Sequence, residues 1–398
     1  MKIAHISIYP QRGQKHVPDG GVAAYEKNLL TNMPKEPGTQ HFVLANRIDS
    51  KDQQYEEDGL TIVRCFDRDM RFLSQLNKRL SQINPDVVHI QHELALFGGL
   101  ATAYLLHVLL FKWHKKVTLT LHGVLGAADV DSDFVKANNY SPAPVWAVRL
   151  GLKLLYWPLA HWPRRVIVHE QFFKDTLVHD YGANPDKVEV IPHGAEEFTA
   201  MDKTDARTML GIGIDKQVVL FMGYAAGYKG IDLLIQGFAE YAKNNPRAFL
   251  IIGAGEHPKL KDDPNYKKIY AGYQQKAKEL LTSDQYKWVG FIPESKVGFY
   301  YSAADVSVYP YTAAMSSSGP MAFAIGYGRP FLASDAFANI FGKELIFASN
   351  STALANKLTD FFGKPDNFEG QIVNLRQDRL WPRTSLKTAT LYKQIGLA

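Results

Sequence analysis

A lysine and a run of serines follow apolar segments in the second half of the chain, where they could bind phosphate. Lys229 lies in the glycine-rich stretch 223–230, and the stretch 315–320 reads Met-Ser-Ser-Ser-Gly-Pro. Backbone amides at a helix start stabilise an anion, and a lysine adds a full positive charge. Neither stretch has the Walker pattern. We predict that Lys229 neutralises a diphosphate and that four residues form a cradle for a phosphate or a sugar: Ser316, Ser317, Ser318 and Gly319.

Two residues of the first half occupy comparable positions. His122 lies at the carboxyl end of the expected buried strand 116–122, where a histidine can donate a hydrogen bond to a sugar hydroxyl. It can equally be a loop histidine held by backbone groups. Gly21 opens an expected helix, where a glycine permits close approach of an anion. A glycine pair there is as often structural, and the dinucleotide fingerprint Gly-x-Gly-x-x-Gly is absent.

The segment 88–93 contains two histidines and a glutamate, which raises the question of a metal site. His89 and His92 are three residues apart on an expected strand, so their side chains should face opposite ways. We therefore expect no metal here and interpret His92 and Glu93 as a pair facing the ligand. An Asp-x-Asp pattern at 129–131 lies in an acidic loop and is interpreted as solvated. Neither a metal nor another cofactor is expected.

The elements that must position these residues are short apolar runs alternating with amphipathic segments. Such runs are typical of strands covered by helices on both faces. The pattern pauses over the polar stretch 195–207 and then restarts. We predict an α/β protein with two doubly wound, Rossmann-like domains, which bind ligands in the cleft at the carboxyl ends of their strands. The expected strands are 2–8, 41–46, 60–65, 87–91, 116–122, 165–169, 188–191, 217–223, 248–254, 286–290, 306–311, 330–334 and 345–348.

The segment 124–164 interrupts this alternation as an insertion. No aspartate or glutamate occurs from Phe134 to His169, whereas half of the six tryptophans and several basic residues do. Tryptophan with lysine and arginine on an apolar helix is typical of an interfacial membrane anchor. The alternative is a helix pair packed on the domain with solvated basic residues.

Composition excludes several classes of protein. The 398 residues include 46% hydrophobic and 21% charged residues, values typical of a globular protein. The net charge of +5 is too small to indicate nucleic-acid binding, and Cys65 is the only cysteine, so no intrachain disulfide forms. We expect no signal peptide and no membrane-spanning helix, because no apolar run is long enough to span a bilayer. We expect a cytoplasmic protein, peripheral at the inner face of the membrane if the insertion is an anchor.

The order of these motifs resembles the GT-B glycosyltransferases, and within them the retaining family 4. The resemblance covers nearly the whole chain except the insertion. It rests on the glycine loop at Gly21, the strand ending in His122-Gly123, the sequence Ile-Pro-His-Gly at 191–194, the lysine loop, and a final helix that ends in Gly-x-Pro at 328–330. It implies an acceptor-side domain over 1–195, a nucleotide-sugar domain over 196–380, and a C-terminal helix over 381–398 that crosses back to the first domain.

The resemblance also implies the function and the roles of individual residues. The enzyme would move a hexosyl group, glucosyl or mannosyl, from a UDP- or GDP-sugar to a glycan or a lipid-linked acceptor, with retention and without a metal. Lys229 would neutralise the diphosphate, His122 would contact the donor sugar, and Gly21 would let the first domain close. The nucleobase would rest near Phe291 and Ile292. His92 and Glu93 would lie on the acceptor side.

Three positions depart from the family pattern. Tyr224 replaces the usual arginine of the lysine loop, and Met315 and Phe323 replace two glutamates that usually contact the donor sugar and the ribose. These changes leave the donor unspecified. They also leave open a non-catalytic nucleotide- or sugar-binding relative, or another GT-B enzyme such as a sugar-nucleotide epimerase. A phosphorylase is disfavoured, because no lysine marks a pyridoxal phosphate site.

Overall fold

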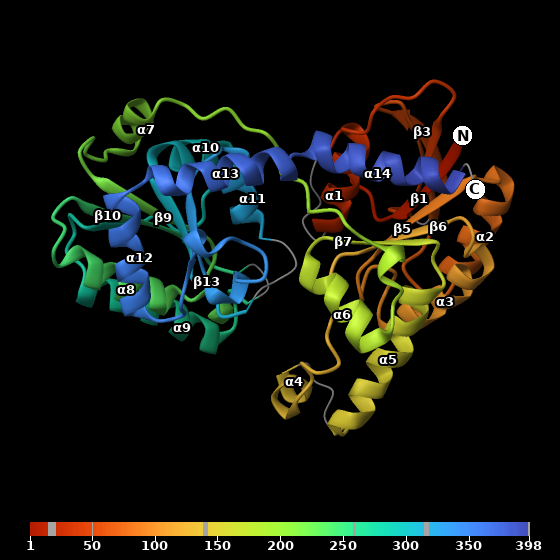
Figure 1. Cartoon of the computed structure of the whole chain (residues 1–398), viewed down its shortest axis with the longest axis horizontal. Coiled ribbons are helices and arrows are strands. Elements are labelled where there is room, and N and C mark those ends of the chain that lie inside the picture. The colour runs from red at the N-terminus through yellow and green to blue at the C-terminus, as the bar shows by residue number, and fades with distance from the viewer. Residues whose placement is uncertain (15–20, 50, 138–141, 258–259, 314–317, 397–398) are drawn as a thin grey trace. The chain divides into compact units, whose positions relative to one another are not determined.

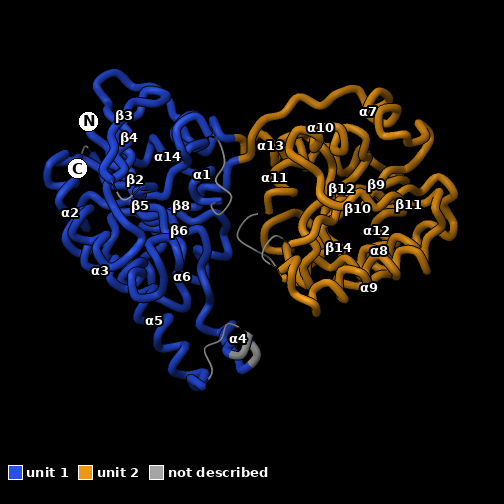
Figure 2. Tube along the Cα trace, turned by 180° about the vertical axis from the view of Figure 1, so that it is seen from behind, with its two compact units in different colours: residues 1–194, 381–398 blue, residues 195–380 orange. Residues whose placement is uncertain are grey.

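The chain folds into two compact α/β units (Figures 1 and 2). The computed structural model describes residues 1–14, 21–49, 51–137, 142–257, 260–313 and 318–396. Unit 1 comprises Met1–Gly194 with Trp381–Ala398, and unit 2 comprises Ala195–Leu380. Each unit has one sheet of mainly parallel strands, as the alternating pattern predicts.

The sheet of unit 1 has the strand order β3-β4-β2-β1-β5-β6-β7-β8. Its neighbouring strands are parallel except β3, which pairs antiparallel with β4. The strands are β1 (Lys2–Ser7), β2 (Gln40–Asn46), β3 (Gln53–Glu57), β4 (Leu60–Phe66), β5 (Val87–His92), β6 (Val117–Leu121), β7 (Arg165–Val168) and β8 (Val188–Val190).

Strand β3 was not expected from the sequence, because Gln-Gln-Tyr-Glu-Glu has no apolar alternation. It is the edge strand of a two-residue hairpin whose turn residues, Asp58 and Gly59, both have positive φ. An Asp-Gly turn of this kind is a strong hairpin signal, and it could have revealed the strand.

Helices cover both faces of this sheet, because successive residues of each strand point to opposite sides. Ala4 and Ile6 pack in a core with residues of α2, α3, α5 and α6, whereas Ile3 packs in a second core with α1 and α14. The helices are α1 (Gly21–Thr31), α2 (Phe72–Ile83), α3 (Leu100–Trp113), α4 (Ser132–Ala137), α5 (Val145–His161), α6 (Gln171–Tyr181) and α14 (Trp381–Gly396), with the short η1 (Pro185–Lys187).

The helix α14 completes the core of unit 1, although unit 2 precedes it in the chain. Trp381 is buried, and its ring lies 5.1 Å from that of Tyr25. A Cβ at Gly194 would come within 2.2 Å of the Trp381 ring, so the residue there must be glycine. Further along α14, the Tyr392 hydroxyl lies 2.5 Å from Nδ1 of His89.

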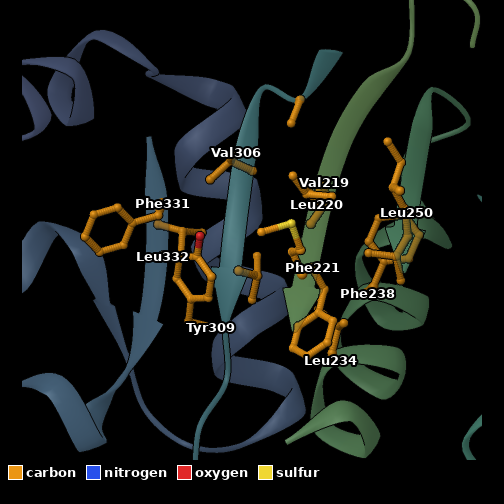
Figure 3. Packing of buried hydrophobic residues seen from close by; sticks show 14 of the residues in the cluster. Val219, Leu220, Phe221, Leu234, Phe238, Leu250, Val306, Tyr309, Phe331 and Leu332 are labelled. Carbon is orange, nitrogen blue, oxygen red and sulfur yellow. The ribbon is translucent and has the colours of Figure 1, made fainter. Parts of the chain in front are cut away.

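Unit 2 has a wholly parallel sheet with the strand order β11-β10-β9-β12-β13-β14. Figure 3 shows its core, in which Val219 and Phe221 of β9 lie between Val306 of β12 and Leu250 of β10. The strands are β9 (Gln217–Tyr224), β10 (Ala248–Gly255), β11 (Tyr286–Trp288), β12 (Val306–Tyr309), β13 (Phe331–Ser334) and β14 (Ile346–Phe347).

Helices connect these strands and cover the sheet of unit 2. The α-helices are α7 (Lys203–Leu210), α8 (Ile231–Ala242), α9 (Pro264–Leu280), α10 (Glu294–Ala303), α11 (Gly319–Gly326), α12 (Ser351–Gly363) and α13 (Asp366–Arg379). Short 3-10 turns are η2 (Gly227–Lys229), η3 (Asp335–Phe337) and η4 (Lys343–Leu345).

The expected insertion contains α4 and α5, and α5 packs on α3. The Tyr104 hydroxyl of α3 donates to the carbonyl of Gly151 at 2.8 Å, and Leu155 and Leu159 are buried in the core. Other apolar residues of α5 are exposed, and the helix projects from the sheet of its unit (Figure 1). No helix in the described part of the chain is long and apolar enough to span a bilayer.

We predict that Trp381→Ala destabilises unit 1 by about 3–5 kcal/mol, because it empties a buried aromatic site. Chemical denaturation of both variants and wild type measures the change. Leu386→Ala is the matched control, since Leu386 lies on the same helix and is 46% exposed. Equal, small effects of the two changes would show that α14 does not contribute to the core as described.

Candidate functional site

The predicted diphosphate site lies at the carboxyl ends of β9 and β12 in unit 2. Lys229 ends the turn η2, and its Nζ lies 3.8 Å from the ring centre of Tyr311 and 4.9 Å from that of Tyr228. The turn is fixed by Gly230, which has φ +66° and where a Cβ would come within 1.8 Å of the Pro310 carbonyl oxygen. Only glycine fits this position.

Lys229 is buried with no carboxylate partner among the residues that the structure describes. Burial disfavours the charged form and lowers the pKa of Lys229 to about 8. The two tyrosine faces stabilise the ammonium through cation–π interaction, which replaces only part of its lost hydration. An anion bound beside it would restore the charge and gain a strong ion pair.

The start of α11 lies beside this lysine. Tyr301 and Tyr309 donate hydrogen bonds to the carbonyl of Pro320 at 2.7 and 2.8 Å, and these bonds fix the first turn of the helix. Ser318 lies 2.9 Å from the Tyr311 hydroxyl through its Oγ, and Gly319 is exposed at the start of the helix. The structure thus brings Ser318 and Gly319 near Lys229, while Ser316, Ser317 and Met315 lie outside the described residues.

Tyr224, which stands where the family has arginine, forms an exposed aromatic surface with Phe291. Their rings are parallel within 11°, with centres 5.8 Å apart, and Phe291 is 60% exposed. Ile292, predicted to contact a nucleobase together with Phe291, is buried instead and packs against Gly253. Phe291 and Tyr224 therefore offer the surface on which a base can stack.

Phe323 stands at the position of the second missing glutamate. Its ring packs at 5.5 Å from Phe198 and 6.1 Å from Tyr301. An aromatic ring suits these neighbours, whereas a carboxylate there would lose hydration without a partner.

The predicted His122 lies in a chain of buried polar groups at the carboxyl ends of β5, β6 and β7 in unit 1. Gln91 donates through Nε2 to Oε2 of Glu26 at 2.6 Å, and its Oε1 lies 2.8 Å from Nε2 of His122. Nδ1 of His122 lies 3.3 Å from Nε2 of His169, whose Nδ1 lies 3.0 Å from the carbonyl oxygen of Ile191. Burial and the neighbouring His169 lower the pKa of His122, so its ring is neutral.

Protonation of Glu26 decides which nitrogen of His122 carries the proton. If Glu26 is ionised, Gln91 donates to it and accepts from His122, so Nδ1 of His122 is an acceptor. His169 must then donate from both nitrogens and carry a positive charge. If Glu26 is protonated, the side-chain amide of Gln91 rotates so that its oxygen accepts from Glu26 and its nitrogen donates to His122. His122 then donates to His169, and His169 donates to the carbonyl of Ile191. In this arrangement every group of the chain is neutral.

Burial raises the pKa of Glu26 to about 7, against the smaller opposing effects of His89 and Gln91. The carboxyl has no solvent exposure, and its Oε1 lies 3.3 Å from Nδ1 of His5. The Glu26 carboxyl, which neutral histidines surround, therefore exchanges between its protonated and ionised forms near neutral pH.

His92 and Glu93 do not form the expected pair. His92 is buried on the opposite face of β5 from His89, as the spacing predicts, and neither of its ring nitrogens has a hydrogen-bond partner among the described residues. Burial, together with His107, lowers the pKa of His92 to about 4. Glu93 is exposed just after the strand.

The remaining predicted positions lie in loops of unit 1. Gly21 is the first residue of α1, and a Cβ there would meet no atom within 4 Å. Asp131 of the Asp-x-Asp pattern accepts a hydrogen bond from the amide of Phe134 at 2.7 Å and so serves the start of α4. No group of three or more metal-ligating side chains occurs in the described ranges.

Sequence reasoning missed Glu26, Gln91, His169 and Tyr311, which surround the predicted residues. Gln91 directly precedes His92 and stands two residues after His89, so the alternation of β5 could have placed it on the face of His89. Glu26 gives no such signal, because a glutamate in an amphipathic helix is normally exposed.

Comparisons with known proteins bear on the family and the fold of the chain. The model of Glycosyltransferase Family 4 matches residues 19–197, and that of Glycosyl transferases group 1 matches residues 202–339. Mannosylfructose-phosphate synthase from Agrobacterium fabrum is 30% identical over 41% of this chain and 40% of its own length. D-inositol 3-phosphate glycosyltransferase from Acidothermus cellulolyticus is 31% identical over 34% of this chain and 30% of its own. The alignments thus span well under half of these relatives.

Solved structures resemble the whole chain. Sucrose-phosphate synthase from Thermosynechococcus elongatus superposes with a TM-score of 0.68 at 20% identity, over 99% of this chain and 98% of that one. HepE from Anabaena, solved with UDP, gives 0.69 at 15% identity, over 99% and 100%. The fold and the family matches define a glycosyltransferase of the GT-B class. Within that class, the chain is a family-4-like glycosyltransferase.

We predict that Glu26 makes the stability of unit 1 depend on pH. Its folded pKa of about 7 exceeds the reference value of 4.5, so the protonated carboxyl favours the folded state. This contribution is present below pH 4.5 and is lost as the pH rises through about 7. Relative to Glu26→Gln, wild type should therefore lose up to about 3 kcal/mol of unfolding free energy across this window.

Urea denaturation at a series of pH values measures this difference. Glu93→Gln is the control, since Glu93 is exposed and should leave the pH dependence of wild type unchanged. A difference between wild type and Glu26→Gln that stays constant with pH would contradict the raised pKa.

Proposed function

We propose that this glycosyltransferase moves a hexosyl group, glucosyl or mannosyl, from a UDP- or GDP-sugar to a glycan or a lipid-linked acceptor. The observation that carries the proposal is the buried Lys229, held between two tyrosine rings beside the start of α11. A diphosphate is the ligand that such a site accommodates, because it supplies the missing negative charge and accepts from the helix amides.

In the proposed reaction, the bond between the anomeric carbon and the diphosphate oxygen breaks, and a bond to the acceptor oxygen forms. Positive charge develops on the sugar ring and negative charge on the leaving diphosphate. Lys229 and the amides around Ser318 and Gly319 would stabilise the leaving group, which is a large catalytic term. Attack from the face of the leaving group retains configuration, and a phosphate oxygen takes the proton of the acceptor hydroxyl. No residue of the mechanism requires a metal.

The His122 network would orient the donor sugar. Both ring nitrogens of His122 are engaged, by Gln91 and by His169. To donate to a sugar hydroxyl, Nε2 would exchange Gln91 for that hydroxyl, which requires the arrangement with ionised Glu26. Glu93, which is exposed just after β5, would lie on the acceptor side, and Gly21 would give the donor room at the start of α1.

The names of the related proteins support a nucleotide-sugar donor. HepE from Anabaena was solved with UDP and with UDP-glucose, and the curated relatives act in sugar-phosphate or inositol-phosphate chemistry by name. The aromatic surface of Tyr224 and Phe291 would take the nucleobase by stacking. Tyr224 in place of arginine, together with Phe323 in place of glutamate, favours the second candidate, a non-catalytic nucleotide-binding relative.

We further propose that α5 contacts the membrane as a peripheral anchor. Its exposed apolar residues recur at helical spacing on one face: Trp146 (68% exposed), Leu150 (48%), Leu154 (59%) and Trp157 (49%). An apolar face that includes tryptophan inserts into the interfacial region of a bilayer. Such a contact would bring the enzyme to a lipid-linked acceptor.

We predict that Lys229→Ala weakens the binding of the preferred nucleotide sugar by about 10- to 100-fold, as expected for loss of a charge-assisted contact. Wild-type binding should also weaken as the pH rises through about 8, where free Lys229 loses its proton. Calorimetry with UDP- and GDP-sugars measures both effects, and Lys243→Ala, an exposed lysine of unit 2, is the control.

Product analysis by NMR then distinguishes the candidates. If the donor sugar has an axial anomeric bond and the product of transfer or slow hydrolysis has one as well, the result supports the retaining enzyme. Binding without turnover across acceptors supports the non-catalytic relative, and formation of an epimerised sugar nucleotide supports the epimerase. Binding that is unchanged in Lys229→Ala would refute the diphosphate site itself.

For the membrane contact, we predict that the double change Leu154→Ser and Trp157→Ser weakens binding to vesicles by at least about tenfold, because it removes two inserted apolar side chains. Co-sedimentation with phosphatidylcholine vesicles containing phosphatidylglycerol measures this. The control is Ile269→Ser with Leu280→Ser, two exposed apolar residues of α9 in unit 2. Equal effects of the two pairs, or none, would contradict the anchor.

A further inference from the structure

A basic pocket of about 400 Å³ opens at the amino ends of β6, β7 and β8 in unit 1. This is the edge of the sheet opposite to His122, which follows the carboxyl end of β6. A five-residue strand separates the two edges by roughly 15 Å. The lining of the pocket includes His114, Lys115, Trp162, Arg164, Arg165 and Lys187.

The sheet itself sets the positions of these cations. Arg165 begins β7 and pairs with Thr118 of β6, while Lys187 directly precedes Val188, the first residue of β8. The amide of Arg164 donates to the carbonyl of Val117 at 2.9 Å. The positive groups are therefore gathered by neighbouring strands rather than by a loose loop.

No carboxylate lines the pocket or pairs with these cations among the described residues. Arg164 and Lys115 have no side-chain hydrogen bond within that part of the chain, and Lys187 donates only to the carbonyl of His161, at 3.2 Å. Cations gathered in this way repel one another, and the repulsion is relieved when an anion enters.

The guanidinium group of Arg165 is partly buried in the protein. Its Nε is buried and has no hydrogen-bond partner among the residues that the structure describes, and its Nη1 makes one long contact of 3.4 Å with the carbonyl of Asp186. A buried donor without an acceptor is costly, and the guanidinium fork matches the oxygens of a phosphate.

We propose that this pocket binds a phosphate group, as a second anion site separate from the diphosphate site of unit 2. Phosphate is favoured over a carboxylate because several cations converge on a space large enough for a tetrahedral group and its substituent. The proposal does not depend on the glycosyl-transfer reaction, since no predicted donor or acceptor residue lines the pocket.

Two sources could supply the phosphate, and the surroundings of Trp162 bear on them. The Trp162 ring lies 5.4 Å from that of Phe111 and 6.4 Å from that of Trp157, both largely exposed. The pocket is thus continuous with the apolar face of α5. That face suits a lipid phosphate, whose headgroup would enter the pocket, whereas a free sugar or glycerol phosphate would use the pocket alone.

Glycerol 3-phosphate and vesicles of phosphatidylcholine with phosphatidic acid carry the same phosphomonoester and serve as the two probes. We expect the double change Lys115→Gln with Arg164→Gln to weaken binding by at least about tenfold. The control, Lys112→Gln with Lys153→Gln, removes the same charge from exposed residues of α3 and α5 outside the pocket. Lys187→Gln alone serves if the first variant melts at a lower temperature than wild type.

The possible results distinguish a site for soluble phosphates, a site for a lipid headgroup and diffuse attraction. Pocket-dependent binding of both probes, or of glycerol 3-phosphate alone, supports a site for soluble phosphates; pocket-dependent binding of vesicles alone supports a lipid headgroup. Equal losses in the pocket and control variants would show diffuse attraction only and overturn the proposal, as would no binding of either probe. Loss of glycerol 3-phosphate binding in Lys229→Ala would also overturn it, because the phosphate would then occupy the donor site.

Discussion

Unit 1 depends on a buried polar chain that runs from Glu26 through Gln91 and His122 to His169. Desolvating such groups is costly, so the chain is stable only if each donor meets an acceptor. The surrounding fold meets this demand from several elements: α1 supplies Glu26, β5 supplies Gln91, and α14 covers the neighbouring His89 with Tyr392. Because the partners of His122 are fixed in this way, its tautomer follows from the protonation of Glu26.

In unit 2 the buried charged group, Lys229, is stabilised in a different way. Lys229 has aromatic faces rather than a hydrogen-bonded chain, and its cationic form is only partly stabilised. One unit thus holds neutral groups whose protons can shift, and the other holds a cation that gains when an anion binds. In both units, parallel strands bring loops that are distant in sequence to one edge of a sheet, which lets so few residues form each site.

The alternating apolar pattern was sufficient to predict two parallel α/β sheets, and the loops after strands indicated Lys229 and His122. It could not reveal β3, because edge pairing needs no apolar alternation. It also could not place Ile292 in the core and Phe291 on the surface, since both residues are apolar and follow each other in the same loop. Glu26 was missed because propensity treats a helical glutamate as exposed, whereas tertiary contacts bury it. The pairing of His92 with Glu93 failed because adjacent residues at a strand end turn to different sides.

The order of elements along the chain has a consequence for how the molecule is made. Unit 1 contains both β1 and α14, and all of unit 2 lies between its two segments. On a ribosome adding roughly 5–20 residues per second, unit 2 can therefore complete its sheet before α14 emerges. During those tens of seconds the surface that Trp381 and Tyr392 later cover stays open to water. The first unit therefore begins first but can complete its core only after unit 2 has been made.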